Sequence, residues 1–468
     1  MKPLRFSIVW LVMMNVTYGV YGQPLPPPQR ITDATQPITI EWMYKEAEKY
    51  DRGLPSSESW STQGHSFAYL IASVTEPPDL IVYDPVQDAT QVLLTPQALG
   101  NLISLGTTVV PVSATASLDS ASSPNSEIKP IRITGFEWMK DDSSMRLHTE
   151  QGVYLYDRQT PSIRKIEYPD GDKNDVTFSP DGKFIAYTRQ FDLYAYDFEQ
   201  RREIRLTHDG NERLRNGELD WVYPEELEIR HGFSWSPDSH AIVYLQQNEE
   251  GVSSYPITDF SSPIPTTRTQ IYPKAGTRNP SVRVGVVRLS TLETRWLDLG
   301  YPYEYVGRMA WAPDGNFITV QALNREQNRL AFVCADPWDG SSWVGFEESD
   351  PYWINLNEKL VWLEDTEDFL WLSERDGYRH IYRVAREGKT IKQLTKGDWE
   401  VTRILDAPHA TRQIFFEATK ESPLERHIYS ISWNGGRIQK LSEGVGTHSG
   451  SVSKDGRFIY DRFNNTST

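Results

Sequence analysis

Cysteine is almost absent from this 468-residue sequence, which contains only Cys334. A single cysteine excludes an intrachain disulfide and a cysteine-based metal site. We interpret Cys334 as a small buried hydrophobic residue. Long apolar runs are also missing: after the first 22 residues none approaches the ~18 residues needed for a transmembrane helix. The mature chain is therefore expected to be soluble.

Basic residues are outnumbered as well, with 48 Lys and Arg against 64 Asp and Glu, for a formal net charge of −16. Nucleic-acid binding requires a basic footprint, so this class of protein is excluded. An acidic balance suits cationic or neutral ligands instead. The sequence contains no HExxH motif and no clustered Cys and His residues. We therefore predict no metal ion and no cofactor.

The first residues have the pattern of a targeting segment. Lys2 and Arg5 precede an apolar run over residues 6–16, and small residues follow in residues 17–22. This pattern predicts a secretory signal peptide over residues 1–22, with an uncleaved membrane anchor as the alternative. Residues 23–37 are rich in proline and indicate an extended spacer. Export without disulfides favours a periplasmic or extracellular location.

The composition is rich in aromatic and turn-forming residues. The sequence contains 15 Trp, 24 Tyr and 17 Phe together with 30 Gly and 30 Pro. Such a composition is typical of an all-β protein with many tight turns. Residues 38–50 form the exception, because their apolar residues recur at helical spacing and predict one short amphipathic helix near the N-terminus.

A local motif recurs along the chain. It occupies residues 178–187, 235–244 and 311–320, with a degenerate copy at 452–460. In each copy an aromatic or apolar residue ends one strand, a Pro-Asp-Gly-like turn follows, and an aromatic or β-branched run begins the next strand. With looser copies the count reaches about eight units, and repetition of this kind indicates a β-propeller. We therefore predict an all-β, eight-bladed β-propeller.

Glu225 and Glu226 stand side by side at the end of the segment DWVYPEE, residues 220–226. Paired carboxylates beside aromatic side chains suit a cationic group such as a peptide amino terminus, because an ammonium has three donors and no acceptor. Each contact contributes about 4 kcal/mol of Coulomb energy at about 4 Å and an effective dielectric of about 20. Pro224 fits the first position of a short helix, whose first turn favours negative charge. The alternative interpretation is a solvated acidic helix start.

This segment leads directly into the copy at residues 235–244. It is followed by YPKAG at 272–276, by Asn279 and Pro280, and by DGYRHIY at 376–382. In order and spacing these motifs resemble the N-terminal propeller of the dipeptidyl peptidase IV family, in the prolyl oligopeptidase superfamily. The resemblance covers about residues 38–463. Other propellers share the Ser-Pro-Asp-Gly turns but not the Trp-Val-Tyr-x-Glu-Glu segment.

The resemblance implies a mechanism of length selection. In that family two glutamates bind the free N-terminus of the substrate, so that only two residues fit before the catalytic serine and dipeptides are released. Glu225 and Glu226 match these positions, and Pro224 stands where some members have a further glutamate. Tyr223 belongs to the same motif and joins the predicted substrate-binding set. Related enzymes dimerise, so a homodimer is a further expectation.

Two more residues are assigned to the substrate site by the same resemblance. Arg146 matches, by its spacing from Asp157, an arginine that grips a substrate carbonyl, with a solvated strand arginine as the alternative. Phe346 follows Trp343-Val344-Gly345 and matches a substrate-facing aromatic residue. The arginine that follows this aromatic in some members is replaced here by Glu347.

The family's reaction is carried out by a C-terminal α/β-hydrolase domain with a Ser-Asp-His triad. The sequence contains no Gly-x-Ser-x-Gly nucleophile elbow and no detectable triad. We therefore predict no catalytic residues in this chain, with residues 464–468 as a truncated linker to a hydrolase domain joined in cis in relatives. The expected function is the substrate-gating propeller of a secreted dipeptidyl-peptidase-like serine exopeptidase. Alternatives are a stand-alone peptide-binding or scaffolding propeller and a periplasmic propeller of the TolB kind.

Overall fold

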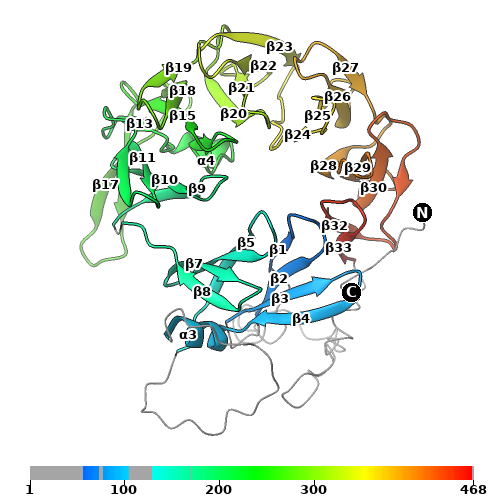
Figure 1. Cartoon of the computed structure of the whole chain (residues 1–468). Helices are drawn as coiled ribbons and strands as arrows, with labels where there is room; N and C mark the ends of the chain where they lie inside the picture. Colours follow the sequence, from blue (N-terminus) through cyan, green and yellow to red (C-terminus); the bar gives the residue numbers. More distant parts are fainter. Residues whose placement is uncertain (1–55, 73–76, 105–128, 170, 466–468) are drawn as a thin grey trace. The chain divides into compact units, whose positions relative to one another are not determined.

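The computed structural model describes residues 56–72, 77–104, 129–169 and 171–465. Antiparallel strands that follow one another along the chain account for nearly all of its regular structure (Figure 1). In this described part the helices are α3 (Pro96–Ser104) and α4 (Val222–Glu226). The predicted signal peptide, spacer and N-terminal helix lie outside the described residues.

The chain divides into two compact units, and the first consists of residues 1–167 and 398–468. Its first sheet contains β1 (Ser56–Trp60), β2 (Phe67–Ile71), β3 (Asp79–Asp84) and β4 (Ala89–Leu94). Its second contains β5 (Ile133–Trp138), β6 (Ser144–Thr149), β7 (Gly152–Asp157) and β8 (Ser162–Lys165). The third contains β28 (Val401–Asp406), β29 (Gln413–Ala418), β30 (His427–Ser432) and β31 (Gln439–Lys440). Two further strands, β32 (Thr447–Val452) and β33 (Ile459–Asn464), form a two-stranded sheet.

The second unit, residues 168–397, contains four larger sheets. One is built from β9 (Asn174–Phe178), β10 (Phe184–Arg189), β11 (Asp192–Asp197) and β12 (Arg202–Arg205). The next has five strands: β13 (Leu214–Asn216), β14 (Phe233–Trp235), β15 (Ala241–Asn248), β18 (Ser281–Arg288) and β19 (Thr294–Trp296). Then come β20 (Tyr305–Trp311), β21 (Ile318–Leu323), β22 (Arg329–Ala335) and β23 (Ser342–Ser349). The last contains β24 (Val361–Trp362), β25 (Phe369–Ser373), β26 (His380–Val384) and β27 (Ile391–Gln393). A separate hairpin pairs β16 (Ser254–Asp259) with β17 (Thr266–Ile271).

The predicted number of eight blades is wrong. The described residues contain seven sheets of four or five strands, three in the first unit and four in the second, so the fold is an all-β, seven-bladed β-propeller. The degenerate motif at residues 452–460 joins β32 to β33, which form a sheet of only two strands. The motif encodes one strand-turn-strand hairpin, and a hairpin can form without the two further strands that complete a blade.

The turn chemistry of the motif is as predicted. The hydroxyl group of Ser179 donates to Asp181 Oδ1 at 2.7 Å and accepts from the backbone N–H of Phe184 at 2.9 Å. Gly182 has φ +73°, a left-handed conformation that favours glycine. The same Ser–Asp hydrogen bond recurs between Ser236 and Asp238 and between Ser453 and Asp455. These three turns therefore share a hydrogen bond from a serine to the aspartate two residues later.

One core cluster of the second unit consists largely of β-branched and aliphatic residues. Val243, Val284 and Val320 are essentially fully buried, in one cluster with the apolar residues of α4. Cys334 on β22 is also fully buried, as predicted, and burial raises the pKa of its thiol to about 12. Each square ångström of apolar surface removed from water contributes roughly 25 cal/mol. The apolar residues of α4 pack into this cluster.

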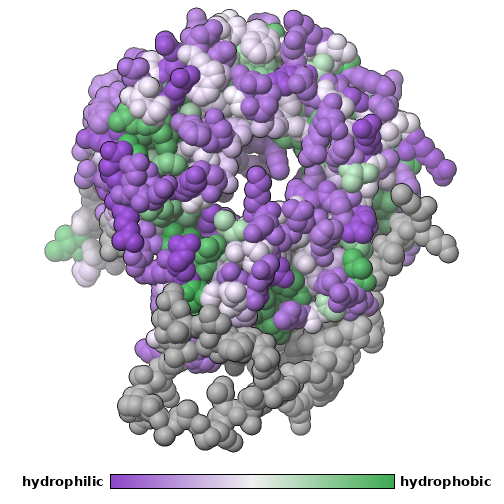
Figure 2. Space-filling model, in the orientation of Figure 1, coloured by the Kyte–Doolittle hydropathy of each residue, from purple (hydrophilic) through white to green (hydrophobic). Residues whose placement is uncertain are grey.

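The surface is polar, in keeping with the acidic composition. Figure 2 shows that the visible face of the described residues is mainly hydrophilic, with apolar side chains in separate patches. In the part of the chain that the structure describes, no helix combines the length and apolar character required to cross a membrane.

Candidate functional site

Helix α4 presents two adjacent carboxylates to solvent. Val222, Tyr223 and the following Leu227 are buried, whereas Glu225 and Glu226 are exposed. Within the described residues neither glutamate makes a hydrogen bond or an ion pair with another side chain. The helical turn predicted for this pair is therefore present, and both carboxylates are accessible to a ligand.

The helix begins earlier than the sequence predicts. We expected Pro224 at the first helical position, but α4 starts at Val222 and Pro224 is its third residue. The carboxylate of Asp220 explains the difference, because its Oδ1 accepts the backbone N–H of Tyr223 at 3.1 Å. A side-chain oxygen that accepts an N–H of the first turn stabilises a helix start. The helix therefore begins where Asp220 can accept an N–H of its first turn.

A buried polar network fastens the start of α4 to its neighbours. The backbone N–H of Asp220 donates to Gln247 Oε1 on β15, and Gln247 Nε2 donates to Asp220 Oδ1. Asp220 is only 6 % exposed, and its Oδ2 has no hydrogen-bond partner among the described residues. Burial, with a smaller contribution from Glu249, raises the pKa of Asp220 to about 6. The network therefore contains an acid that titrates close to neutral pH.

Tyr223 lies inside the protein. Its side chain is 2 % exposed, and its hydroxyl oxygen accepts the backbone N–H of Val306 on β20 at 3.2 Å. Burial raises its pKa well above the usual range. Tyr223 therefore holds α4 against β20. The prediction that it also contacts a substrate remains untested.

Arg308 supports the other end of the helix. Its Nη1 donates to the backbone carbonyl of Leu227, the C-cap residue of α4, at 2.6 Å. A cation at a helix C-terminus also interacts favourably with the helix dipole. Burial lowers the pKa of Arg308 from its ordinary value. Sequence reasoning missed this residue, since an arginine within a strand carries no local signal of a contact some 80 positions away.

Aromatic rings flank α4, as the composition of the segment suggested. The ring of Trp221 meets that of Tyr272 edge-on, with centroids 4.6 Å apart. The ring of Tyr272 in turn packs against the ring of Tyr255 on β16, with centroids 6.2 Å apart. Lys274 Nζ lies 4.7 Å from the centroid of the Tyr255 ring. The YPKAG motif thus supplies an aromatic neighbour to Trp221, the residue before α4.

Phe346 lies on β23 in the same unit as α4. Its ring stacks on Phe332, with centroids 5.0 Å apart and an interplanar angle of 10°, and meets the edge of Trp371 at 5.1 Å. The guanidinium carbon of Arg375 lies 5.9 Å from the Phe346 centroid, and Arg375 Nη2 pairs with Glu348 Oε1 at 2.5 Å. Arg375 lies in the turn between β25 and β26, so this turn places a guanidinium group beside Phe346. Only the tertiary structure reveals this arrangement.

Arg146 belongs to the other compact unit, on β6. It is 7 % exposed, and its Nη1 pairs with Glu137 Oε2 at 2.5 Å. His148 Nε2 lies 3.2 Å from the other oxygen of Glu137. Burial lowers the pKa of Arg146, while the charge of Glu137 opposes this shift. Arg146 is thus a buried, paired residue, unlike the solvated strand arginine considered as an alternative. Its predicted role toward a substrate remains untested.

The structure brings the predicted site residues together only in part. Glu225, Glu226 and Tyr223 share α4, and Phe346 lies on β23 of the same unit. For metal binding, the described residues contain no group of three or more His, Cys, Asp or Glu side chains arranged to hold an ion. The arrangement around α4 is suited to binding a cation through carboxylates.

Comparison with known proteins identifies the family. The family description "Dipeptidyl peptidase IV (DPP IV) N-terminal region" matches residues 138–468. A probable dipeptidyl peptidase 4 from Aspergillus flavus is 28 % identical over 328 residues, covering 64 % of this chain and 42 % of the fungal protein. A dipeptidyl peptidase 4 from Trichophyton rubrum is 31 % identical over 288 residues, covering 56 % and 36 %. The chain thus spans less than half the length of these relatives.

Solved structures share the fold. The crystal structure of Porphyromonas gingivalis dipeptidyl peptidase 4 superposes with a TM-score of 0.74 at 22 % identity, covering 91 % of this chain and 58 % of that one. A putative dipeptidyl aminopeptidase IV from Bacteroides ovatus gives a TM-score of 0.68 at 21 % identity, covering 89 % and 59 %. With the family match over residues 138–468, we conclude that this chain belongs to the dipeptidyl peptidase IV N-terminal region family, the propeller region of dipeptidyl peptidases.

Proposed function

We propose that this chain is the substrate-gating propeller of an exported, dipeptidyl-peptidase-like serine exopeptidase, and that Glu225 and Glu226 bind the amino terminus of the peptide. One observation carries the proposal: two exposed carboxylates share one helical turn and make no internal hydrogen bond or ion pair within the described residues. Membership of the family supports it. Export rests on the signal peptide predicted over residues 1–22.

The chemistry of the pair suits a free amine. A protonated amino terminus has three N–H donors, and each ionised carboxylate is an acceptor of a charge-assisted hydrogen bond. An N-acetylated peptide has neither the charge nor these donors. The site therefore distinguishes free from blocked peptides by electrostatics, with about 4 kcal/mol of Coulomb energy per contact at about 4 Å and an effective dielectric of about 20.

The buried supports of α4 fit this role. The start of the helix is bonded to β15 through Asp220 and to β20 through Tyr223. Its C-terminal end is bonded to β20 through Arg308. A fixed helix places the amine at a set position, and a hydrolase domain joined in cis would then meet the peptide bond at a set distance from it. In this proposal, this chain selects peptides with a free amino terminus, and the hydrolase domain cleaves the peptide bond.

Isothermal titration of the full chain with alanyl-proline amide and its N-acetyl form tests the proposal. We expect the free dipeptide to bind at least about tenfold more tightly, since a charged hydrogen bond contributes about 1.5–3 kcal/mol. The double substitution Glu225→Gln and Glu226→Gln should abolish this preference. Glu228→Gln is the matched control, because Glu228 is exposed just beyond the end of α4. Equal affinity of the wild-type chain for both peptides would overturn the proposal.

Catalysis by the isolated chain is the second test. Because we assign bond cleavage to a separate domain, we expect the purified chain not to turn over Xaa-Pro chromogenic substrates. Turnover that persists through successive purification steps, and that a serine-directed inhibitor abolishes, would contradict the assignment of cleavage to a separate domain.

A further inference from the structure

A cavity of about 640 Å³ borders the segment that follows α4. Residues 228–231 line it together with residues of β9, β14 and β20, and all of them belong to the second unit. Neither Glu225 nor Glu226 lines it. Cavities of about 300–1,000 Å³ whose walls combine apolar side chains with a few polar groups are typical of small-molecule sites. This cavity is therefore a candidate binding site that the proposed amine site does not use.

The apolar part of the wall is contributed by three neighbouring strands. Phe178 on β9, Trp235 on β14 and Met309 on β20 all line the cavity. Trp235 is held in place, because it is 7 % exposed and its Nε1 donates to the backbone carbonyl of Thr177 at 3.4 Å. Aromatic rings and the flexible thioether of methionine pack well against hydrocarbon groups. This wall suits the apolar body of a small ligand.

Arg308 has one edge of its guanidinium group unused. Its Nη1 donates to the backbone carbonyls of Leu227 and Gly307, each at 2.6 Å, so both hydrogens of Nη1 are used. Its Nε and Nη2 make no hydrogen bond or ion pair within the described residues, although Arg308 lines the cavity. The edge formed by two guanidinium nitrogens matches the two oxygens of a carboxylate. Arg308 can therefore bind a carboxylate while it still supports α4.

Two carboxylates line the cavity without occupying this edge. Glu228 and Glu358 are exposed, and neither makes a hydrogen bond or ion pair in the described part of the chain. Arg230 lines the same cavity, is exposed, and likewise has no bonded partner among the described residues. The wall thus carries two arginines to which no described carboxylate is bonded.

The remaining charged pair on this side of the unit is closed. His231 lines the cavity, and its Nδ1 pairs with Asp175 Oδ1. The other oxygen of Asp175 accepts the backbone N–H of Gly232 at 3.3 Å. Since both oxygens of Asp175 are bonded, this carboxylate does not compete for Arg308.

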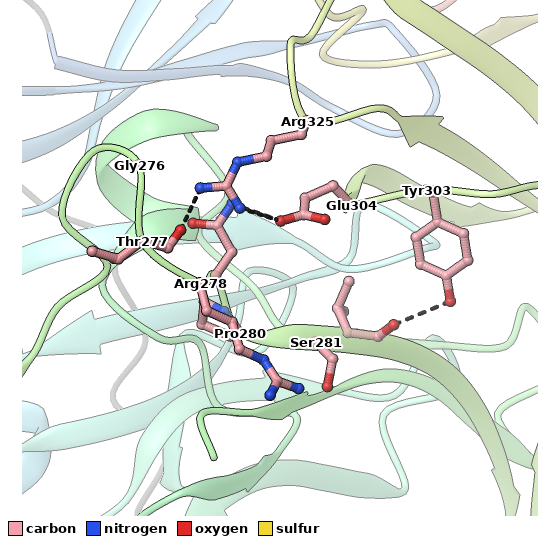
Figure 3. Close-up of a pocket in the computed structure, with 10 residues that line it drawn as sticks. Gly276, Thr277, Arg278, Pro280, Ser281, Tyr303, Glu304 and Arg325 are labelled. Atoms are coloured by element: carbon pink, nitrogen blue, oxygen red, sulfur yellow. Dashed lines mark hydrogen bonds and ion pairs between the residues drawn. The ribbon is translucent and has the colours of Figure 1, made fainter. Parts of the chain in front are cut away.

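The other large cavity of this unit, of about 730 Å³, offers a comparison. There Arg325 Nη1 donates to Glu304 Oε1 at 2.9 Å, and Arg325 Nη2 donates to the backbone carbonyl of Thr277 (Figure 3). Each edge of the Arg325 guanidinium group therefore contains a bonded nitrogen. Arg278 lines this second cavity, is exposed, and has no bonded partner among the residues described. Arg278 is thus a matched control for Arg230.

We propose that the cavity beside residues 228–231 binds a small molecule that combines a carboxylate with an apolar body. The carboxylate accepts hydrogen bonds from Nε and Nη2 of Arg308, and the body packs against Trp235 and Met309. A free organic acid and the carboxyl terminus of a short apolar peptide share this chemistry. The inference goes beyond the proposed function, because the site uses neither Glu225 nor Glu226.

Isothermal titration of the full chain with N-acetyl-phenylalanine and its C-terminal amide tests the proposal. Neither probe has a free amine, so neither depends on the glutamate pair. We expect the acid to bind at one site and the amide to bind at least about tenfold more weakly, since the amide cannot form the charged, bidentate pair of hydrogen bonds. Equal affinities for acid and amide, or no binding of the acid, would overturn the proposal.

Variants of the wall identify the groups that bind the acid. Arg308→Lys keeps a cation at the end of α4 but lacks the planar edge, and it should weaken binding of the acid about tenfold. Arg230→Gln should weaken it severalfold, whereas Arg278→Gln should have no effect. Glu358→Gln removes a like charge from the wall and should strengthen binding of the acid. Wild-type affinity in Arg308→Lys, or weaker binding in Glu358→Gln, would contradict a carboxylate at Arg308.

Thermal unfolding of each variant, measured on the same preparation, separates a lost contact from a lost fold. Arg230→Gln and Glu358→Gln change exposed side chains, so they carry the test even where Arg308→Lys is less stable. Opposite shifts in affinity for the acid in these two variants are expected. Shifts in the same direction would overturn the proposal.

Two further probes distinguish the sources of the carboxylate. Tighter binding of 3-phenylpropionate assigns the cavity to free organic acids, and tighter binding of N-acetyl-prolyl-phenylalanine assigns it to peptide carboxyl termini. Saturating alanyl-proline amide should not displace N-acetyl-phenylalanine, because the amide has no carboxylate. Loss of free-amine preference in the glutamate variants with intact binding of the acid would overturn only the proposed function. Intact free-amine preference without binding of the acid would overturn only the present inference.

Discussion

The backbone N–H of Asp220 donates to Gln247 Oε1 at 2.6 Å, and Gln247 Nε2 donates back to Asp220 Oδ1 at 3.4 Å. Both side chains are buried, and together they join the segment entering α4 to the middle of a propeller sheet. Asp220 then binds the backbone of Tyr223. The position of Glu225 and Glu226 therefore depends on buried polar groups that never reach the surface.

Gln247→Leu should destabilise the chain. The substitution leaves the backbone N–H of Asp220 buried without its acceptor, at a cost of about 1–3 kcal/mol in the free energy of unfolding. Urea denaturation followed by tryptophan fluorescence measures the loss. Gln200→Ala, at an exposed turn position, is the control and should change stability by less than about 0.5 kcal/mol. Equal stability of Gln247→Leu and the wild-type chain would show that the Asp220–Gln247 pair contributes little.

The free energy of unfolding should change with pH because Asp220 titrates. Its folded-state pKa of about 6 lies above the ordinary value of 3.8, so the folded chain binds more protons than the unfolded chain between these values. The contribution of Asp220 to stability is therefore full below about pH 4 and is lost as the pH rises through about 6. The loss is on the order of 3 kcal/mol.

Asp220→Asn removes this titration. We expect the difference in unfolding free energy between Asp220→Asn and the wild-type chain to shift in favour of the variant as the pH rises from 4 to 7. Denaturation curves at intervals of half a pH unit measure it. Parallel pH profiles of the two proteins would contradict the raised pKa.

Arg308→Ala should loosen the C-terminal end of α4. The substitution removes the donor to the Leu227 carbonyl and the cation at the helix end, which together contribute about 1–2 kcal/mol. Hydrogen–deuterium exchange should be faster in α4 and unchanged in β26, which belongs to another sheet. Arg268→Ala, in the exposed β17 strand, is the control. Unaltered exchange in α4 would show that Tyr223 and Asp220 alone hold the helix.

Phe346→Leu tests the assignment of Phe346 to the substrate site. Leucine retains an apolar side chain against Phe332 and Trp371 but removes the aromatic face, so we expect a stability loss of about 1–2 kcal/mol. Contact with substrate predicts in addition a severalfold weaker binding of alanyl-proline amide. Measuring both quantities on the same preparation separates the two effects. A stability loss with unchanged affinity would show that Phe346 only packs against its neighbours.

Short-range chemistry could be predicted from the order of residues alone. The Ser-Pro-Asp-Gly turns form through bonds between residues two to five positions apart, as at Ser179, Asp181 and Phe184, so their presence follows from the local sequence. The helical turn that carries Glu225 and Glu226 is likewise local, with Asp220 three residues before Tyr223. The all-β class, the turn positions and the carboxylate pair could all be predicted for this reason.

Long-range packing decided the rest. Pairing of strands limited β32 and β33 to a two-stranded sheet and reduced the predicted eight blades to seven. The bond from Val306 to Tyr223 joins residues 83 positions apart, and it makes Tyr223 a buried support of α4. Arg375 reaches Phe346 from a different sheet. Such contacts depend on which strands meet and how their side chains fill the space between them, and no local pattern of residues encodes that outcome.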